Sequence, residues 1–337
     1  MDFGKINHIR YCSLYLLEIY SSEMAKKKII TIVVDISTSL NTRGPANFIK
    51  GLHAILPYKK KNCNFIPSKT IYPFKEKRKS KFYFIPFPIF DELIYNEWIN
   101  IKEANKLILG PCFVPTNWTI FPNKDIWKER EFPKILKQVK GIAVHSERVR
   151  NYLSKRTNTT NLLNKYKIIR PCTNIKPKAI KPFIKRNIDI LFFEKYIDLN
   201  HSQQGIQLYN LFNNSSKKIE RLKYGDYTKE KMEYLANNSK FIIYFSFFDT
   251  GAIGLKEIQN YGVFAFSHQK DLIIHNDTGF YVPELAYNKD MSQAYKIIMK
   301  KIEIVTSSNP NAQTFAIINQ EINKCQNTLN DLCENLL

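Results

Sequence analysis

The sequence predicts an α/β protein of two domains, each built on a parallel sheet covered by helices. Strand and helix signals alternate along both halves of the chain, and a compact strand–helix–strand unit occupies residues 241–266. Strands that alternate with helices imply parallel pairing, with helices on both faces of the sheet. The chain has 337 residues, which is long enough for two domains of ordinary size.

Charge divides the chain into two unequal parts. Residues 1–186 hold 36 Lys and Arg against 13 Asp and Glu, whereas residues 187–337 hold 15 against 17. The change falls near a proline-containing segment, residues 170–182, whose composition is typical of a linker. We expect the following parts: an extension at 1–24, a first domain at 25–180, a second domain at 181–310 and a C-terminal helix at 311–337.

Cysteine, histidine and hydropathy patterns limit the class of protein. The six cysteines are scattered without a Cys-x-x-Cys pair, which argues against a zinc site or a disulfide framework and indicates a reducing compartment. The six histidines show no metal-ligand spacing, so we expect no metal. No apolar run reaches the roughly 18 residues of a membrane span. Residues 11–20 are too short for one and lack a signal-peptide cleavage site. A cytoplasmic protein is the expectation.

In the first domain the strand pattern begins at residues 28–35. A loop at 37–44 follows, and Pro45 is well suited to the first position of a helix. Ser146 is the predicted N-cap of a later helix, which turns Val149 and Leu153 inward. The other strands that we expect are 81–87, 106–109, 141–145 and 167–170.

The second domain repeats this plan. Residues 188–193 predict a strand, and Thr228 is the predicted N-cap of a helix that runs to residue 237. Further helices are expected at 204–212 and 291–305.

Two carboxylates mark the strand–helix–strand unit of the second domain. Asp249 and Glu257 lie between a strand at 241–245 and a strand at 263–266. Ligands of open α/β sheets bind at the carboxyl ends of the strands, where this loop would lie. Gly251 would let the backbone approach a ligand closely. Because a carboxylate repels phosphate, its expected partners are sugar hydroxyls.

This stretch resembles the retaining GT-B glycosyltransferases, especially family 4 (group 1). That family carries a Glu-x7-Glu element, and Asp249 stands at the first Glu and Glu257 at the second. Gly262 follows five residues later, as in the family, and a hydrophobic strand comes next. Residues 276–283 supply the acidic-polar-Gly-hydrophobic turn that completes the pattern. A plain Rossmann-type unit with a solvated acidic helix start is the alternative.

The resemblance implies a GT-B fold, in which two Rossmann-like domains face each other across a cleft and the final helix packs back towards the first domain. It implies a glycosyltransferase that moves a sugar, with retention, from a nucleoside-diphosphate-sugar to a hydroxyl acceptor. The nucleotide-sugar is a co-substrate, and no cofactor is implied. By resemblance, Glu257 would bind the ribose and Asp249 the donor sugar. Backbone N–H groups of the segment Gly251, Ala252, Ile253 and Gly254 would meet sugar or phosphate.

The resemblance also assigns positions around the diphosphate and the base. The family places an Arg and a Lys against the diphosphate, and here Lys195 and the neutral Gln204 stand at those positions. Lys195 can replace the Arg as a point charge, without its bidentate fork. A solvated lysine is the alternative interpretation. Tyr227 lies where the family seats the base, and its role in stacking is a hypothesis.

Three residues are expected near the cleft from the first domain. Arg43 and Gly44 match the loop after the first strand that, in the family, reaches the donor phosphates and the acceptor. His145 ends a strand just before Ser146, so it is either a catalytic or acceptor-binding residue or a satisfied core histidine.

The basic first domain leaves the partner open. In the family this domain binds the acceptor, here a glycan, lipid or protein, and lysine clusters could also hold it against an anionic membrane surface. Nucleic-acid binding, including glycosylation of DNA, is a competing and less favoured interpretation. A degenerate GT-B protein that binds without turnover is another, because Asp249 and Gln204 depart from the family pattern.

Overall fold

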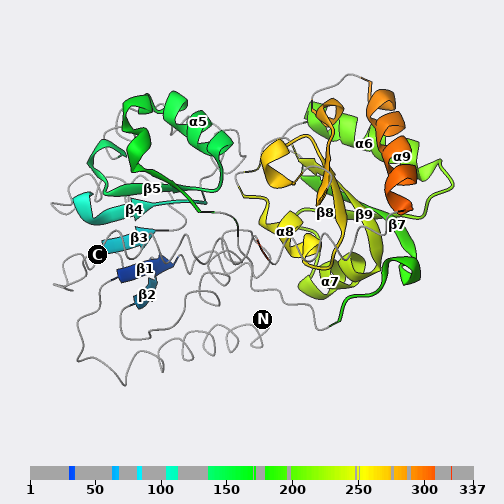
Figure 1. The fold of residues 1–337 in the computed structure, drawn as a ribbon, viewed down its shortest axis with the longest axis horizontal. Coiled ribbons are helices and arrows are strands. Elements are labelled where there is room, and N and C mark those ends of the chain that lie inside the picture. The colour runs from blue at the N-terminus through cyan, green and yellow to red at the C-terminus, as the bar shows by residue number, and fades with distance from the viewer. Residues whose placement is uncertain are drawn as a thin grey trace, which may run out of the picture.

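The computed structural model describes residues 30–34, 63–67, 82–85, 104–112, 136–169, 171, 179–195, 199–246, 249, 251–274, 277–286, 290–307 and 320. Arg43 and Gly44 lie outside these residues, as do the predicted extension at 1–24 and all but residue 320 of the predicted helix at 311–337. The described residues form two parallel sheets with their helices, which Figure 1 shows as two lobes side by side.

The first sheet has the strand order β2–β1–β3–β4–β5–β6, and every pair of neighbouring strands is parallel. Buried apolar side chains fill β4 and β5, as expected for a sheet that is covered on both faces. The strands are β1 (Ile30–Val34), β2 (Cys63–Pro67), β3 (Phe82–Ile85), β4 (Leu107–Leu109), β5 (Gly141–Val144) and β6 (Tyr166–Ile168).

Helix α5 (Glu147–Arg156) begins where the sequence predicts. Ser146 has extended backbone angles, and its Oγ accepts a hydrogen bond from the N–H of Val149 at 3.3 Å. Val149 and Leu153 are buried, so the inward face of the helix is also as predicted. This cap fixes the start of α5 at the carboxyl end of β5.

The second sheet has the order β11–β10–β9–β7–β8 and is likewise parallel. Its strands are β7 (Ile188–Lys195), β8 (Ile219–Lys223), β9 (Ser239–Ser246), β10 (Phe264–Ser267) and β11 (Gly279–Tyr281). Its helices are α6 (Leu199–Asn213), α7 (Lys229–Asn238), α8 (Ile253–Gln259) and α9 (Ser292–Thr306). The predicted unit β9–α8–β10 is confirmed, with its two strands parallel and adjacent.

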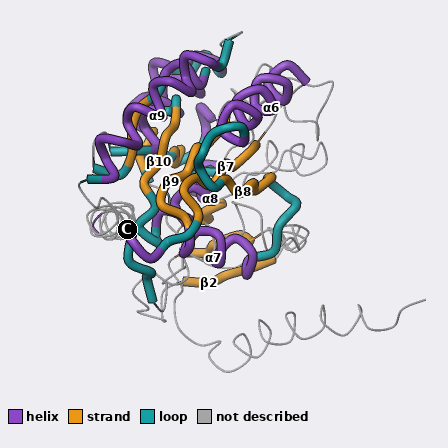
Figure 2. The backbone as a smooth tube through the Cα atoms, turned by 90° about the vertical axis from the view of Figure 1, so that its right-hand side faces the viewer, coloured by secondary structure: helices purple, strands orange, loops and turns teal. Residues whose placement is uncertain are grey.

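Two apolar clusters cover the two faces of this sheet. Side chains alternate along the strands, so Ile242 and Tyr244 face α7 and α8 while Ile243 and Phe245 face α6 and α9. Figures 1 and 2 show these helix pairs on opposite sides of the strands. Of the helices that the structure describes, none combines the length and the apolar character that crossing a lipid bilayer requires.

Three short strands were not predicted from the sequence. β8 carries Glu220, Arg221 and Lys223 among its five residues and forms an edge of the second sheet, so its signal is weak. β2 and β11 also lie at sheet edges, and β11 is only three residues long. Helix α6 begins at Leu199, five residues before the predicted start. Edge strands bury less apolar surface, which removes the pattern that reveals a central strand.

Gly279 gives a test of the β10–β11 pairing. A Cβ at this position would lie 2.2 Å from the carbonyl oxygen of its register partner Ala265, which is backbone and cannot move aside. A Cβ at Gly141 of β5 would meet its nearest atom at 3.7 Å, an ordinary contact. We expect Gly279→Ala to lower the free energy of unfolding by about 1–3 kcal/mol. Gly141→Ala should change it by less than about 0.5 kcal/mol. Urea unfolding of both variants is the measurement, and equal effects would contradict the pairing.

Candidate functional site

The second sheet reverses its winding direction between β7 and β9. From β7 the chain continues to β8 on one side and then crosses to β9 on the other, which is a topological switch point. Lys195 and Ser246 end these two strands and are partners in the register. Asp249 follows three residues after Ser246, so the predicted carboxylate lies at the carboxyl edge where open α/β sheets bind ligands.

Both carboxylate oxygens of Asp249 are bonded inside the protein. The Lys195 Nζ donates to Oδ2 at 2.7 Å, and the Tyr244 hydroxyl donates to the same oxygen at 2.6 Å. The N–H groups of Ala252 and Gly251 donate to Oδ1 at 2.9 and 3.3 Å. Asp249 is only 8% exposed. Four donors match the number of lone-pair sites on a carboxylate, so its hydrogen-bonding capacity is used.

Lys195 and Asp249 hold each other in the charged state. Burial alone would raise the pKa of Asp249, but the Lys195 ammonium, the Tyr244 hydroxyl and the Ala252 N–H outweigh it and lower the pKa to about 2. Burial likewise opposes the charge of Lys195, and the Asp249 carboxylate outweighs it and raises the lysine pKa. The Lys195 Nζ also lies 4.8 Å from the centre of the Tyr224 ring, a cation–π contact.

The loop between β9 and α8 has an unusual backbone. Ala252 adopts a left-handed conformation with φ 45° and ψ 45°, which is unfavourable for a residue with a Cβ. Its N–H bond to Asp249 helps to hold it there. A Cβ on the preceding Gly251 would lie 2.4 Å from Cδ2 of His145, so only glycine allows the imidazole to approach this closely.

Gln269 fastens this loop from the segment after β10. Its Nε2 donates to the carbonyl of Ser246 at 2.9 Å, and its Oε1 accepts the N–H of Asp249 at 2.8 Å. The backbone N–H of Gln269 in turn donates to the Ser267 hydroxyl at 3.1 Å. One amide side chain therefore fixes both the last residue of β9 and the residue that carries the carboxylate.

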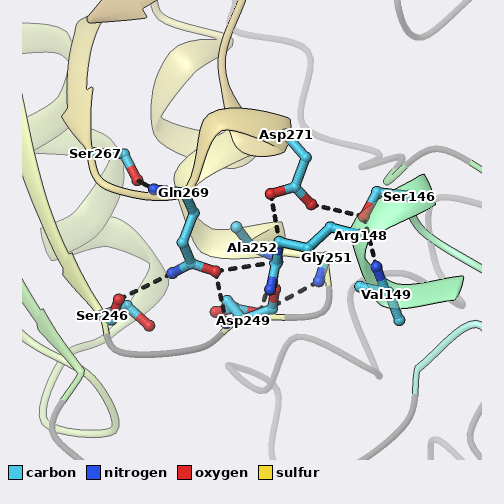
Figure 3. Close-up of polar contacts among 10 residues, drawn as sticks. All are labelled: Ser146, Arg148, Val149, Ser246, Asp249, Gly251, Ala252, Ser267, Gln269 and Asp271. Atoms are coloured by element: carbon cyan, nitrogen blue, oxygen red, sulfur yellow. Dashed lines mark hydrogen bonds and ion pairs between the residues drawn. The ribbon is translucent and has the colours of Figure 1, made fainter. Parts of the chain in front are cut away.

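Residues at the start of α5 bond to the same region from the first lobe. Arg148 donates through Nε to Asp271 at 2.6 Å, and through Nη2 to the Asp249 carbonyl at 2.5 Å and to Gln269 Oε1 at 3.1 Å. The Ser146 hydroxyl donates to the other Asp271 oxygen at 2.6 Å. Figure 3 shows these side chains converging between α5 and the loops of the second sheet.

His145 is a buried, neutral histidine at this contact. Its Nδ1 donates to the carbonyl of Ile169 at 2.8 Å, and burial lowers its pKa to about 4 despite that bond. Its Nε2 lies 3.7 Å from the Cys112 sulfur. Burial raises the pKa of Cys112 far above its usual value, which keeps the thiol protonated. The pair is therefore unsuited to nucleophilic catalysis, since the thiolate is the reactive form.

The other residues that are predicted to bind the nucleotide-sugar lie on helix α8 or pack against it. Glu257 lies on this helix and is 3% exposed, and Ile253 at the helix start is 6% exposed. A Cβ on Gly254 would meet the Tyr227 hydroxyl at 3.7 Å, so this tyrosine packs over the first turn of the helix. Burial, followed by the Glu257 charge, raises the pKa of Tyr227. The second predicted diphosphate position, Gln204, is on α6.

The structure thus brings Lys195, Asp249 and the loop glycine Gly251 together, with His145 against that glycine. Sequence reasoning missed four further residues of the network: Tyr244, Gln269, Asp271 and Arg148. Tyr244 carried a weak signal, because its hydroxyl stands in the otherwise apolar run 241–245. The other three had no local signal, because their partners lie far away in the chain.

The low pKa of Asp249 predicts how stability depends on pH. Its folded-state pKa of about 2 lies below the ordinary 3.8, so its contribution is fully present above about pH 4. That contribution is lost as the pH falls towards 2. Between about pH 5 and pH 3, wild type should lose about 1 kcal/mol more stability than Asp249→Asn, which lacks the titrating group. Urea unfolding at several pH values measures this, and parallel pH curves would contradict the assignment.

No protein-family model matches the sequence, and no curated protein matches it by sequence. Solved structures do match. An apo lipopolysaccharide outer core galactosyltransferase, WaaB, has a TM-score of 0.57 at 11% identity, over 92% of this chain and 100% of its own. Sucrose-phosphate synthase from Thermosynechococcus elongatus has a TM-score of 0.60 at 9% identity, over 92% of this chain and 99% of its own. A GtfA/B complex has a TM-score of 0.50 at 10% identity, over 80% and 59%.

At such low identities these likenesses show the fold and nothing finer. The matched enzymes are GT-B glycosyltransferases, and their parallel sheets correspond to those seen here. The chain therefore has the α/β fold of the GT-B glycosyltransferases, as its Asp249-to-Glu257 element predicts.

Proposed function

We propose that this protein is a glycosyltransferase that moves a sugar from a nucleoside-diphosphate-sugar to a hydroxyl acceptor, with retention. The observation that carries the proposal is the location of the Asp249–Glu257 element at the switch point of a GT-B-like sheet. The loop and α8 lie where open α/β sheets bind nucleotides. The nucleoside-diphosphate-sugar is a co-substrate, and side chains and backbone N–H groups of the protein orient it.

The proposed residue roles follow the resemblance. Glu257 binds the ribose, Tyr227 lies against the base, Asp249 faces the donor sugar and Lys195 faces the diphosphate. The ion pair between Lys195 and Asp249 adds a condition to these roles. A sugar hydroxyl reaches the Asp249 carboxylate only by replacing one of the four hydrogen bonds that the carboxylate already accepts.

The leaving diphosphate needs positive charge close to it during transfer. Lys195 stays protonated at neutral pH because the Asp249 carboxylate raises its pKa against the effect of burial. A fixed ammonium in a buried site stabilises developing negative charge more strongly than one in water. Lys195 is therefore the proposed electrostatic catalyst, and we assign no general base.

The acceptor is proposed to bind the first lobe. Residues 1–186 carry 36 basic against 13 acidic side chains, which favours an anionic acceptor or an acceptor at an anionic membrane surface.

A binding protein without turnover is the second candidate. The four hydrogen bonds to the Asp249 carboxylate favour it, because a carboxylate whose acceptor sites are all used within the protein has no capacity left for a sugar hydroxyl. Such a protein would bind a nucleoside diphosphate but would not cleave its sugar ester.

The test of the proposed function is release of nucleoside diphosphate from UDP-, GDP-, ADP- and TDP-sugars. We expect wild type to hydrolyse one donor slowly, and Glu257→Ala to lose about a hundredfold in rate because a charged hydrogen-bond partner of the donor is gone. Glu303→Ala, on the exposed surface of α9, is the matched control and should leave the rate unchanged.

Full activity in Glu257→Ala would refute the site assignment. Thermal shifts measured with UDP, GDP, ADP and TDP separate the remaining outcomes. A shift without turnover would favour the binding protein, and neither shift nor turnover would contradict both candidates.

A further inference from the structure

Arg148 bonds to three groups of the second lobe although it belongs to α5 of the first. Its partners are the Asp271 carboxylate at 2.6 Å, the Gln269 Oε1 at 3.1 Å and the Asp249 carbonyl at 2.5 Å. Figure 3 shows the guanidinium pointing between them. Its side chain is 30% exposed and that of Asp271 is 16% exposed, so water screens this ion pair only in part.

The hydrogen bond from Arg148 to the Asp249 carbonyl reaches the backbone of the loop between β9 and α8, which we call the donor loop. Residue 249 is held by its N–H through Gln269, by its C=O through Arg148 and by its side chain through Lys195. With all three groups of one residue fixed, its carboxylate is aimed at the N–H groups of Gly251 and Ala252. Two of these anchors come from the second lobe itself, and the third comes from α5.

The planar guanidinium allows Arg148 to bond to three groups of the second lobe at once. Arginine presents five N–H donors in a fixed fork, so one side chain can bond a carboxylate, an amide oxygen and a carbonyl together. The ammonium of a lysine is a point charge and cannot match these three directions. The Ser146 hydroxyl holds the second oxygen of Asp271, which orients that carboxylate towards the arginine.

We propose that Arg148 is a positioning residue for the donor loop: it sets the backbone at Asp249, and through it the loop of Gly251 and Ala252, from the opposite lobe. The loop then has its binding shape only while α5 lies against it, which couples donor binding to the contact between the lobes. The functional consequence rests on the proposed glycosyltransferase activity, whereas the loop geometry does not.

The experiment compares Arg148→Met and Arg148→Lys with Arg150→Met in the full chain. Arg150 is on the same helix and pairs with Glu147 of that helix, so it is a matched control. Amide hydrogen exchange of a peptide that covers 249–255 reports on the loop. We expect about tenfold faster exchange in this peptide for Arg148→Met, since a charge-assisted hydrogen bond holds the loop. The peptide that covers α7 should not change in any variant.

Binding and kinetics give the second readout. UDP, GDP, ADP and TDP, each added alone, should bind Arg148→Met about tenfold more weakly than wild type, and the donor KM should rise with a smaller change in kcat. Arg148→Lys should have an affinity between those of wild type and Arg148→Met, because lysine keeps the positive charge but lacks the planar fork of donors. Arg150→Met should match wild type in both readouts.

Unchanged exchange in the 249–255 peptide of Arg148→Met would overturn the inference, whatever the activity. Equal effects in Arg148→Met and Arg150→Met would also overturn it, because a general loss of helix stability would then be the cause. If wild type neither binds nor cleaves any of the donors, the proposed function fails. Faster loop exchange in Arg148→Met, without a change in Arg150→Met, would still support the positioning role.

Discussion

The ion pair between Lys195 and Asp249 organises the candidate site. Lys195 is the last residue of β7, and Asp249 lies in the loop that follows β9, so the pair joins these two adjacent strands at the point where the sheet reverses its winding. Both side chains are nearly buried, and burial of a charge is unfavourable unless it is paired and hydrogen-bonded. The Tyr244 hydroxyl and two backbone N–H groups meet this requirement. Removing one partner of such a pair costs about 3–5 kcal/mol.

The loop geometry follows from that pair. Ala252 is in the left-handed region, and its N–H donates to the Asp249 carboxylate. Gly251 leaves room for His145, so the first lobe packs directly against the loop. Arg148 adds a hydrogen bond to the Asp249 carbonyl at the same contact. The two lobes therefore meet at the loop that carries Asp249, so the shape of this loop depends on the contact between the lobes.

The sequence predicted features that depend on short stretches of chain. The N-caps Ser146 and Thr228 were found because capping needs only a hydroxyl at a helix start. The β9–α8–β10 unit was predicted because its strands are buried on both faces, and such strands appear in the sequence as continuous apolar runs. β8 was not predicted because it lies at a sheet edge and its charged residues are typical of a loop.

The site was only partly predictable for a different reason. The position of Asp249 follows from the chain alone, but the bonds that its carboxylate makes depend on where Lys195 and Tyr244 lie in the folded sheet. Arg148 is separated by 101 residues from Asp249 and by 123 from Asp271. No local pattern encodes such a contact.

A double-mutant cycle on Lys195→Met and Asp249→Asn tests the central claim most directly, with the free energy of unfolding measured for both single variants and the double variant. If the ion pair organises the site, the double variant will be less destabilised than the sum of the two singles, by about 2 kcal/mol or more. Effects that add to within about 0.5 kcal/mol would mean that the two residues act independently, and would contradict the account.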